Sequence, residues 1–191
     1  RPRFKLVTGI STGALMAPFA FLGSDYDAQL EKAYTTMSND DIFQPYGPVA
    51  ILLSLANLRV LPSMADSRPL AQLTARMIDA DVLNKVAQEH LKGRRLLIGT
   101  TQLDAQRLVI WNMGAIAVSG HPQALDLFRK IMVASASIPA MFPPQDFEVE
   151  AAGSRFEEMH VDGGTRAQVV LYESSIRVLA VPSRRPRRLF I

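Results

Sequence analysis

Residues 4–22 read Phe-Lys-Leu-Val-Thr-Gly-Ile-Ser-Thr-Gly-Ala-Leu-Met-Ala-Pro-Phe-Ala-Phe-Leu, and this stretch decides the fold. Its first four residues form an apolar run that predicts a short buried strand, and residues 14–22 predict a buried helix that ends at Gly23. Between them lies a G-x-S-x-G sequence, residues 9–13, with Ser11 at its centre. A strand, a sharp turn and a helix around such a serine are the context of a nucleophile elbow, which exposes the hydroxyl at a strand end.

The turn itself carries further expectations. Glycine is expected to be required at Gly9 and Gly13, because a Cβ at either position would collide with the adjacent strand or helix. The backbone N–H of Thr12 is a candidate donor to an oxyanion, and the positive end of the helix dipole favours negative charge near the serine. A G-x-S-x-G also occurs as an ordinary turn without chemistry, so that alternative stays open.

Length and composition indicate one folded domain. The chain has 191 residues, of which 48% are hydrophobic and 20% charged, enough for a sizeable core. It contains no cysteine, which excludes disulfides, a thiol nucleophile and thiolate metal sites. No stretch is long and apolar enough to span a bilayer, and no leader is visible. Because the chain starts without Met and enters a core strand almost at once, we expect missing upstream residues, which leaves cytoplasmic and secreted or envelope-associated locations open.

Basic residues gather towards the C-terminal end. Residues 166–191 hold six arginines and one glutamate, with the cluster Arg184, Arg185, Arg187 and Arg188. Such a cluster fits peripheral contact with anionic phospholipid, contact with nucleic acid, or a solvated linker, and the linker is the favoured interpretation. No aromatic residues are interleaved for base stacking and no nucleic-acid motif accompanies the cluster, so we expect no nucleic-acid partner.

The remaining pattern alternates between helix and strand. Helical spacing of apolar residues is found over 25–37, 49–58, 67–77 and 79–93, and again from 120 into the segment 134–139. Strand-like segments cover 94–101, 107–113, 147–149, 156–161 and 188–191, and 176–181 is a further apolar segment. This alternation predicts an α/β three-layer domain. Residues 42–64 are expected to form either a wall or mobile cap near the ligand-binding crevice or, as the favoured interpretation, ordinary core helix.

A serine hydroxyl needs a base to become a nucleophile, and the usual base is a histidine. The chain has three, His90, His121 and His160, and none of them follows Asp162. His90 and His121 fit surface or capping roles. His160 lies two residues before Asp162, on the same face of a predicted strand, where it would tune that carboxylate, act directly or simply pack.

The remaining candidate base is Asp162. It follows a predicted strand and precedes Gly163 and Gly164, so it lies at a tight turn with little side-chain bulk around it. Partial burial would make this carboxylate a better base. An aspartate before glycines is also a common plain turn, and that alternative remains.

Three segments together resemble bacterial patatin-like phospholipases. They are Gly-Ile-Ser-Thr-Gly-Ala-Leu at 9–15, Ala-Ser-Ala-Ser-Ile-Pro-Ala-Met-Phe-Pro-Pro at 134–144 and Val-Asp-Gly-Gly at 161–164. The resemblance extends over nearly the whole chain and implies a three-layer sandwich whose central, mainly parallel sheet is flanked by helices. It also implies a Ser–Asp dyad, with Ser11 as nucleophile and Asp162 as base, that hydrolyses acyl esters of phospholipids or other lipids through an acyl-enzyme, without metal or cofactor.

One feature of the family is missing. Its members carry a glycine-rich turn after a first strand upstream of the elbow, and the backbone N–H groups of that turn form the oxyanion hole. Only Arg1-Pro2-Arg3 precedes the elbow strand here, so we expect residues 1–191 to be a single patatin-like domain without that strand and turn, cut short at the C-terminal end as well. Two alternatives follow: an impaired domain that binds lipid or acts as a scaffold, and an acyltransferase that uses the same acyl-enzyme.

Overall fold

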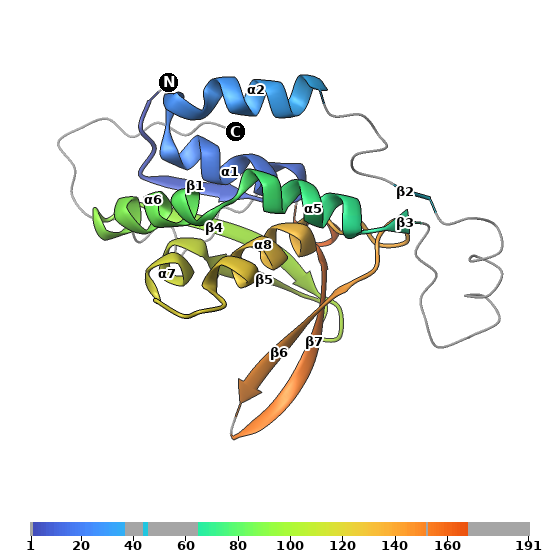
Figure 1. The fold of residues 1–191 in the computed structure, drawn as a ribbon. Helices are drawn as coiled ribbons and strands as arrows, with labels where there is room; N and C mark the ends of the chain where they lie inside the picture. Colours follow the sequence, from blue (N-terminus) through green and yellow to red (C-terminus); the bar gives the residue numbers. More distant parts are fainter. Residues whose placement is uncertain (1, 37–43, 46–64, 152, 168–191) are drawn as a thin grey trace.

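A five-stranded sheet with helices packed against it dominates the computed structural model, which describes residues 2–36, 44–45, 65–151 and 153–167 (Figure 1). In chain order the elements are β1 (Leu6–Gly9), α1 (Thr12–Leu22), the 3-10 helix η1 (Ser24–Tyr26), α2 (Asp27–Thr36), β2 (Gln44–Pro45), β3 (Ala65–Asp66), α5 (Arg68–Met77), α6 (Ala80–Leu91), β4 (Arg95–Gln102), β5 (Arg107–Asn112), α7 (Met113–Val118), α8 (Ala124–Ser135), β6 (Gln145–Ala151), β7 (Ser154–Asp162) and the 3-10 helix η2 (Gly163–Thr165).

Strand β4 is the centre of the sheet. Its first half, residues 95–98, pairs in parallel with β1, and its last residues, 100–102, pair antiparallel with β7. Strand β5 pairs with residues 97–102 and so occupies the opposite edge of β4 along both stretches. Strands β1 and β7 therefore lie end to end along one edge of β4, and their C-terminal ends meet beside Gly99.

The expected α/β class is confirmed, and the sheet is mixed. Among the described strands, β1 and β4 form the parallel pair, whereas β4–β5, β4–β7 and β6–β7 are antiparallel. The sheet was expected to be mainly parallel, and the described pairings correct that expectation. The physical reason lies in the connections: β4 to β5 and β6 to β7 are joined by very short turns, which permit only antiparallel neighbours.

Local sequence signals account for most of the element boundaries. The Asp79 side chain accepts a hydrogen bond of 2.9 Å from the Val82 N–H and so caps α6, and Gly93 after that helix has φ 88°. The short helix α7 was not expected, and Met113, its first residue, had been assigned to the preceding strand. The expected helix 49–58 and the segments 176–181 and 188–191 lie outside the described residues, while Gln44–Pro45, expected in a loop, pairs with β3.

The core lies where α1, α6 and α8 pack together and against β4. Its fully buried side chains include Phe19 and Phe21 of α1, Leu96 and Ile98 of β4, and Phe128 of α8. The β6–β7 hairpin instead extends away from the helices (Figure 1). No helix in the described part of the chain is long and apolar enough to cross a bilayer.

Candidate active site

The nucleophile elbow predicted from the sequence is present as a strand, a turn and a helix. Strand β1 ends at Gly9 and α1 begins at Thr12, with the half-buried Ser11 between them. Ser11 has φ 55° and ψ −129°, a region that a residue with a Cβ rarely occupies. Such a conformation costs on the order of 1–3 kcal/mol, persists only where the surroundings hold it, and is typical of functional sites.

The two glycines of the elbow differ in what they do. A Cβ on Gly9 would lie 2.5 Å from the Gly13 carbonyl oxygen and 2.8 Å from the Cβ of Ala17, so the close approach of β1 to α1 requires glycine, as expected. For Gly13 the expectation of a collision is wrong, because a Cβ there would have no neighbouring atom within 4 Å. A Cβ on Gly13 would point into open space at the start of α1, away from the contact between β1 and that helix.

Asp162 lies at the end of β7, directly against Ser11. The Ser11 hydroxyl donates a hydrogen bond of 2.5 Å to Oδ2 of Asp162, which is only 5% exposed. The other carboxylate oxygen, Oδ1, accepts a bond of 2.7 Å from the Gly164 N–H. A Cβ on Gly163 would lie 2.5 Å from the Gly99 carbonyl oxygen, so the turn can follow β4 this closely only with glycine. The structure thus brings together the two residues that the sequence singled out, 151 positions apart.

Thr12 is the first residue of α1 and its side chain is exposed. The role of its N–H as an oxyanion donor stays a prediction. The N-terminus of α1 does lie next to Ser11, as the dipole argument requires.

His160 is buried beside the site, but its ring nitrogens bond elsewhere. The Trp111 indole N–H donates to the Thr100 hydroxyl oxygen at 2.7 Å, and that hydroxyl lies 2.8 Å from Nδ1 of His160. Nε2 of His160 lies 3.2 Å from the Glu158 carboxylate. Since the indole can only donate and a carboxylate can only accept, the hydroxyl proton points to Nδ1 and the ring carries its proton on Nε2. Burial lowers the pKa of His160, despite the opposing bond to Glu158. This geometry favours the packing role for His160.

The other two histidines have local roles. Nδ1 of the exposed His121 accepts a bond of 3.2 Å from the Gln123 N–H within the turn ahead of α8, which fits the surface role and not a helix cap. His90 lies on α6 against α7, where a Cβ on Gly114 would come within 2.1 Å of its Nδ1. Its Nδ1 is buried without a hydrogen-bond partner, and burial lowers its pKa.

One residue of the site was missed by the sequence reasoning. Ser135, the last residue of α8, is fully buried, and its hydroxyl oxygen accepts a bond of 3.1 Å from the Ser11 N–H. The same hydroxyl donates a bond of 2.7 Å to the Gly99 carbonyl. The sequence did place Ser135 in the 134–144 segment, but nothing local indicated what its hydroxyl would contact.

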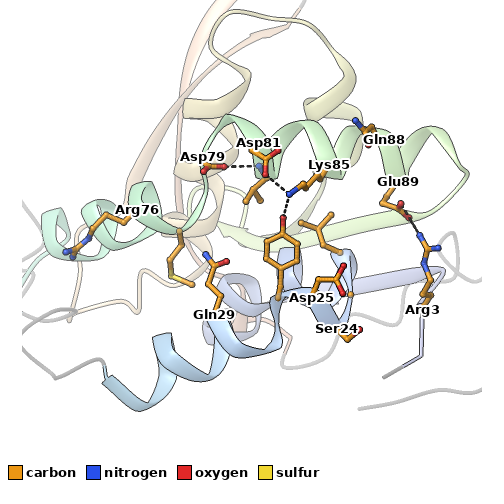
Figure 2. Close-up of a pocket in the computed structure, with 15 residues that line it drawn as sticks. Arg3, Ser24, Asp25, Gln29, Arg76, Asp79, Asp81, Lys85, Gln88 and Glu89 are labelled. Atoms are coloured by element: carbon orange, nitrogen blue, oxygen red, sulfur yellow. Dashed lines mark hydrogen bonds and ion pairs between the residues drawn. The ribbon is translucent and has the colours of Figure 1, made fainter.

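A cavity of about 690 Å³ lies at the far end of α1, and Figure 2 shows the residues that line it. Leu22 and Gly23 line it, whereas Ser11 precedes the first residue of the helix. At 1.5 Å per residue, the 11 residues of α1 separate the two places by about 16 Å. Within the cavity, Lys85 bonds to Asp81 and Tyr26, contacts that raise the pKa of this exposed lysine. The cavity is therefore separate from the candidate active site.

Comparison with known proteins identifies the family. A family model for patatin-like phospholipases matches residues 1–173, which is most of the chain. The chain therefore belongs to the patatin-like phospholipase family, a family of lipid acyl hydrolases, and its expected substrates are lipids. None of the curated proteins compared with the chain matches it. In the residues that the structure describes, no three metal-ligating side chains converge.

Proposed function

We propose that this protein is a serine lipid acyl hydrolase in which Ser11 is the nucleophile and Asp162 its only base. The observation that carries the proposal is the 2.5 Å hydrogen bond from the Ser11 hydroxyl to Oδ2 of Asp162, made by a serine whose backbone is held at φ 55°. A buried carboxylate whose other oxygen is bonded to the Gly164 N–H has one oxygen left for the serine proton. The family match supports the lipid substrate.

The chemistry follows from this arrangement. As Ser11 Oγ attacks the ester carbonyl carbon, its proton passes to Oδ2 of Asp162. Collapse of the tetrahedral adduct breaks the ester bond, and Asp162 returns the proton to the departing alcohol, which leaves an acyl-serine. A water molecule then gives its proton to Asp162 and attacks the acyl carbon, and the fatty acid leaves as Ser11 regains its proton. Negative charge that develops on the carbonyl oxygen is favoured by the N-terminus of α1.

The test is covalent labelling of Ser11 in the full-length protein with a fluorophosphonate, followed by peptide mapping, alongside release of fatty acid from phospholipid vesicles. We expect labelling of the wild type at Ser11, none in Ser11→Ala, and a loss of about 10²- to 10⁴-fold in the labelling and hydrolysis rates of Asp162→Asn. Asp146→Asn, an exposed aspartate on the β6–β7 hairpin, is the matched control and should keep the wild-type rates.

The outcomes separate the alternatives. A folded wild type that binds vesicles without being labelled or releasing fatty acid would be a lipid-binding or scaffold domain, contrary to the proposal. An added alcohol that takes the acyl group in preference to water would indicate an acyltransferase. Wild-type rates in Asp162→Asn would remove the carboxylate from the mechanism.

A further inference from the structure

We propose that Ser135 is a positioning residue for this site: its hydroxyl holds the backbone of Ser11 in the reactive conformation. The inference rests on the proposed function of Ser11. The Ser135 hydroxyl accepts from the Ser11 N–H at 3.1 Å and donates to the Gly99 carbonyl at 2.7 Å, so both of its hydrogen-bonding capacities point to the site. No part of its side chain is exposed, so water does not compete for either bond.

The place of Gly99 explains why a side chain is needed here. Gly99 lies between Ile98, the last β4 residue paired with β1, and Thr100, the first paired with β7. The chain turns away from β4 after Gly9. The Ser11 N–H therefore lies beside Gly99 but is no longer paired with β4 as part of a strand. A hydroxyl can accept from that N–H and donate to the Gly99 carbonyl at the same time. It thus gives a hydrogen-bond partner to two backbone groups that do not pair with each other.

The conformation of Ser11 explains why the contact matters for reactivity. A serine at φ 55° and ψ −129° relaxes towards ordinary backbone angles unless bonds on both sides of it prevent this. On its C-terminal side the Ser11 carbonyl accepts from the Ala14 N–H at 2.9 Å, within the first turn of α1. On its N-terminal side the described bond is the one to Ser135. Removing that hydroxyl frees the peptide plane that sets the direction of Oγ towards Asp162.

The same chain segment also fixes the other half of the dyad. Two residues after Ser135, the Ser137 carbonyl accepts from the Asp162 N–H at 2.9 Å. The last residue of α8 thus contacts the serine through its side chain, and a residue just after the helix contacts the aspartate through its backbone. Ser135 is the contact that a substitution can remove without altering a peptide bond.

Thr74 supplies a matched control. It is almost fully buried on α5, and its hydroxyl donates to the Leu70 carbonyl at 2.8 Å, within the same helix. Ser135→Ala and Thr74→Val each remove one buried hydroxyl, so a role in stability alone would affect the two variants alike. A role in positioning affects Ser135→Ala only.

The first measurement is the rate of fluorophosphonate labelling at Ser11, with kcat and KM for ester hydrolysis, in the full-length protein. We expect Ser135→Ala to lose about 10- to 100-fold in labelling rate and in kcat with little change in KM, because the nucleophile is misplaced while substrate contacts remain. Thr74→Val should stay within about twofold of the wild type in the same quantities. If Ser135→Ala does not fold, Ser135→Cys gives the same comparison, because sulfur keeps the volume but bonds weakly.

The second measurement does not depend on activity. Hydrogen exchange at the Ser11 amide, followed by NMR or mass spectrometry, should accelerate in Ser135→Ala and not in Thr74→Val, because only the first variant removes the acceptor of this amide. A wild type that is not labelled at Ser11 would contradict the proposed function, and exchange at this amide would still decide whether Ser135 holds it. Unchanged exchange, or labelling of Ser135→Ala at the wild-type rate by an active protein, would overturn the inference.

Discussion

At the scale of single residues, the site depends on how closely backbone segments approach one another. Gly9 and Gly163 are both needed because a Cβ on either would come within 2.5 Å of a carbonyl oxygen, whereas Gly13 is in open space. The three glycines look equivalent in the sequence, since each lies within two residues of Ser11 or Asp162. Their neighbours in space differ, and so should the effects of substituting them.

Alanine at these positions should therefore change stability in opposite directions. Gly13→Ala is expected to raise the free energy of unfolding by about 0.5–1 kcal/mol, because alanine is the better helix former and nothing obstructs its Cβ. Gly163→Ala is expected to lower it by roughly 1–3 kcal/mol, because the Gly99 carbonyl must move. Urea unfolding followed by circular dichroism measures both. A stabilised Gly163→Ala, or a strongly destabilised Gly13→Ala, would contradict the packing described.

The sequence allowed the dyad to be predicted but not the residue that positions it. Ser11 and Asp162 each lie in a local pattern, a strand followed by a glycine-containing turn, and such patterns are visible in one sequence. Ser135 acts across 124 positions, through a contact that exists only once α8 has packed beside β4. A serine at the end of a helix has many ordinary roles, so its hydroxyl carries no local signal.

At the scale of elements, a cluster of ion pairs around the buried Glu89 connects α6 to the start of the chain. Glu89 of α6 accepts from Arg94 Nη1 at 2.6 Å, from Lys92 Nζ at 2.7 Å and from Arg3 Nη2 at 2.9 Å. Burial by itself would raise the pKa of Glu89, but the bonds from Lys92 and Arg94, with the charge of Arg3, lower it from 4.5 to about 2. Glu89 therefore binds its proton less readily in the folded chain than in the unfolded one.

Arg94 extends this connection to α1. Its Nε donates to the Phe4 carbonyl at 2.7 Å and its Nη2 to the Phe21 carbonyl, while the guanidinium lies over the Phe21 ring at 4.3 Å. The residue just before β4 thus ties together the segment that leads into β1, the end of α1 and the last turns of α6. Arg94 therefore helps to fix the positions of β1, α1 and α6 relative to one another.

The stability that Glu89 contributes should depend on pH in a defined direction. Its lowered pKa means that the contribution is complete above about pH 4.5 and is lost as the pH falls towards 2. At pH 7, Glu89→Gln is expected to reduce the free energy of unfolding by roughly 1–3 kcal/mol, because the arginines lose a charged acceptor. That difference from the wild type should shrink progressively below pH 4.5. Urea unfolding at a series of pH values measures it, with the exposed Glu31→Gln as control; a difference independent of pH would contradict the assignment.

Helix α7 shows why the local sequence was not enough to predict every helix. The Asn112 side chain accepts from the Ala115 N–H at 3.0 Å and so caps the helix, and that residue type before a short apolar run was the available signal. The run Met-Gly-Ala-Ile-Ala-Val has neither helical nor strand spacing, and the strand before it extends to Asn112. Packing against α6 and α8 decides the outcome, and such contacts are not visible locally.

At the scale of the whole molecule, β4 is the element on which the site is assembled. Strands β1 and β7 come from opposite parts of the chain and meet on one edge of β4, and β5 covers the other. The sequence predicted each of these strands, but not that two of them share an edge, because pairing partners at such separations leave no local pattern. This arrangement, more than either motif alone, sets the distance between serine and carboxylate.

Loss of the site should therefore coincide with loss of the fold. Trp111 is the only tryptophan and lies on β5 opposite Ile98 of β4, so its fluorescence reports on the strand beside which Ser11 and Asp162 meet. We expect the urea midpoints of tryptophan fluorescence and of fluorophosphonate labelling at Ser11 to agree, as they do in a two-state transition. Labelling that disappears at a clearly lower urea concentration would show instead that the elbow opens locally before the sheet unfolds.

The separation of 151 positions between Ser11 and Asp162 also bears on how the protein is made. Ser11 is synthesised long before Asp162, so an incomplete polypeptide on the ribosome would carry the serine without its base. Under the proposed chemistry, hydrolysis of lipid esters would then begin only after the distant carboxylate has been synthesised and folded into place.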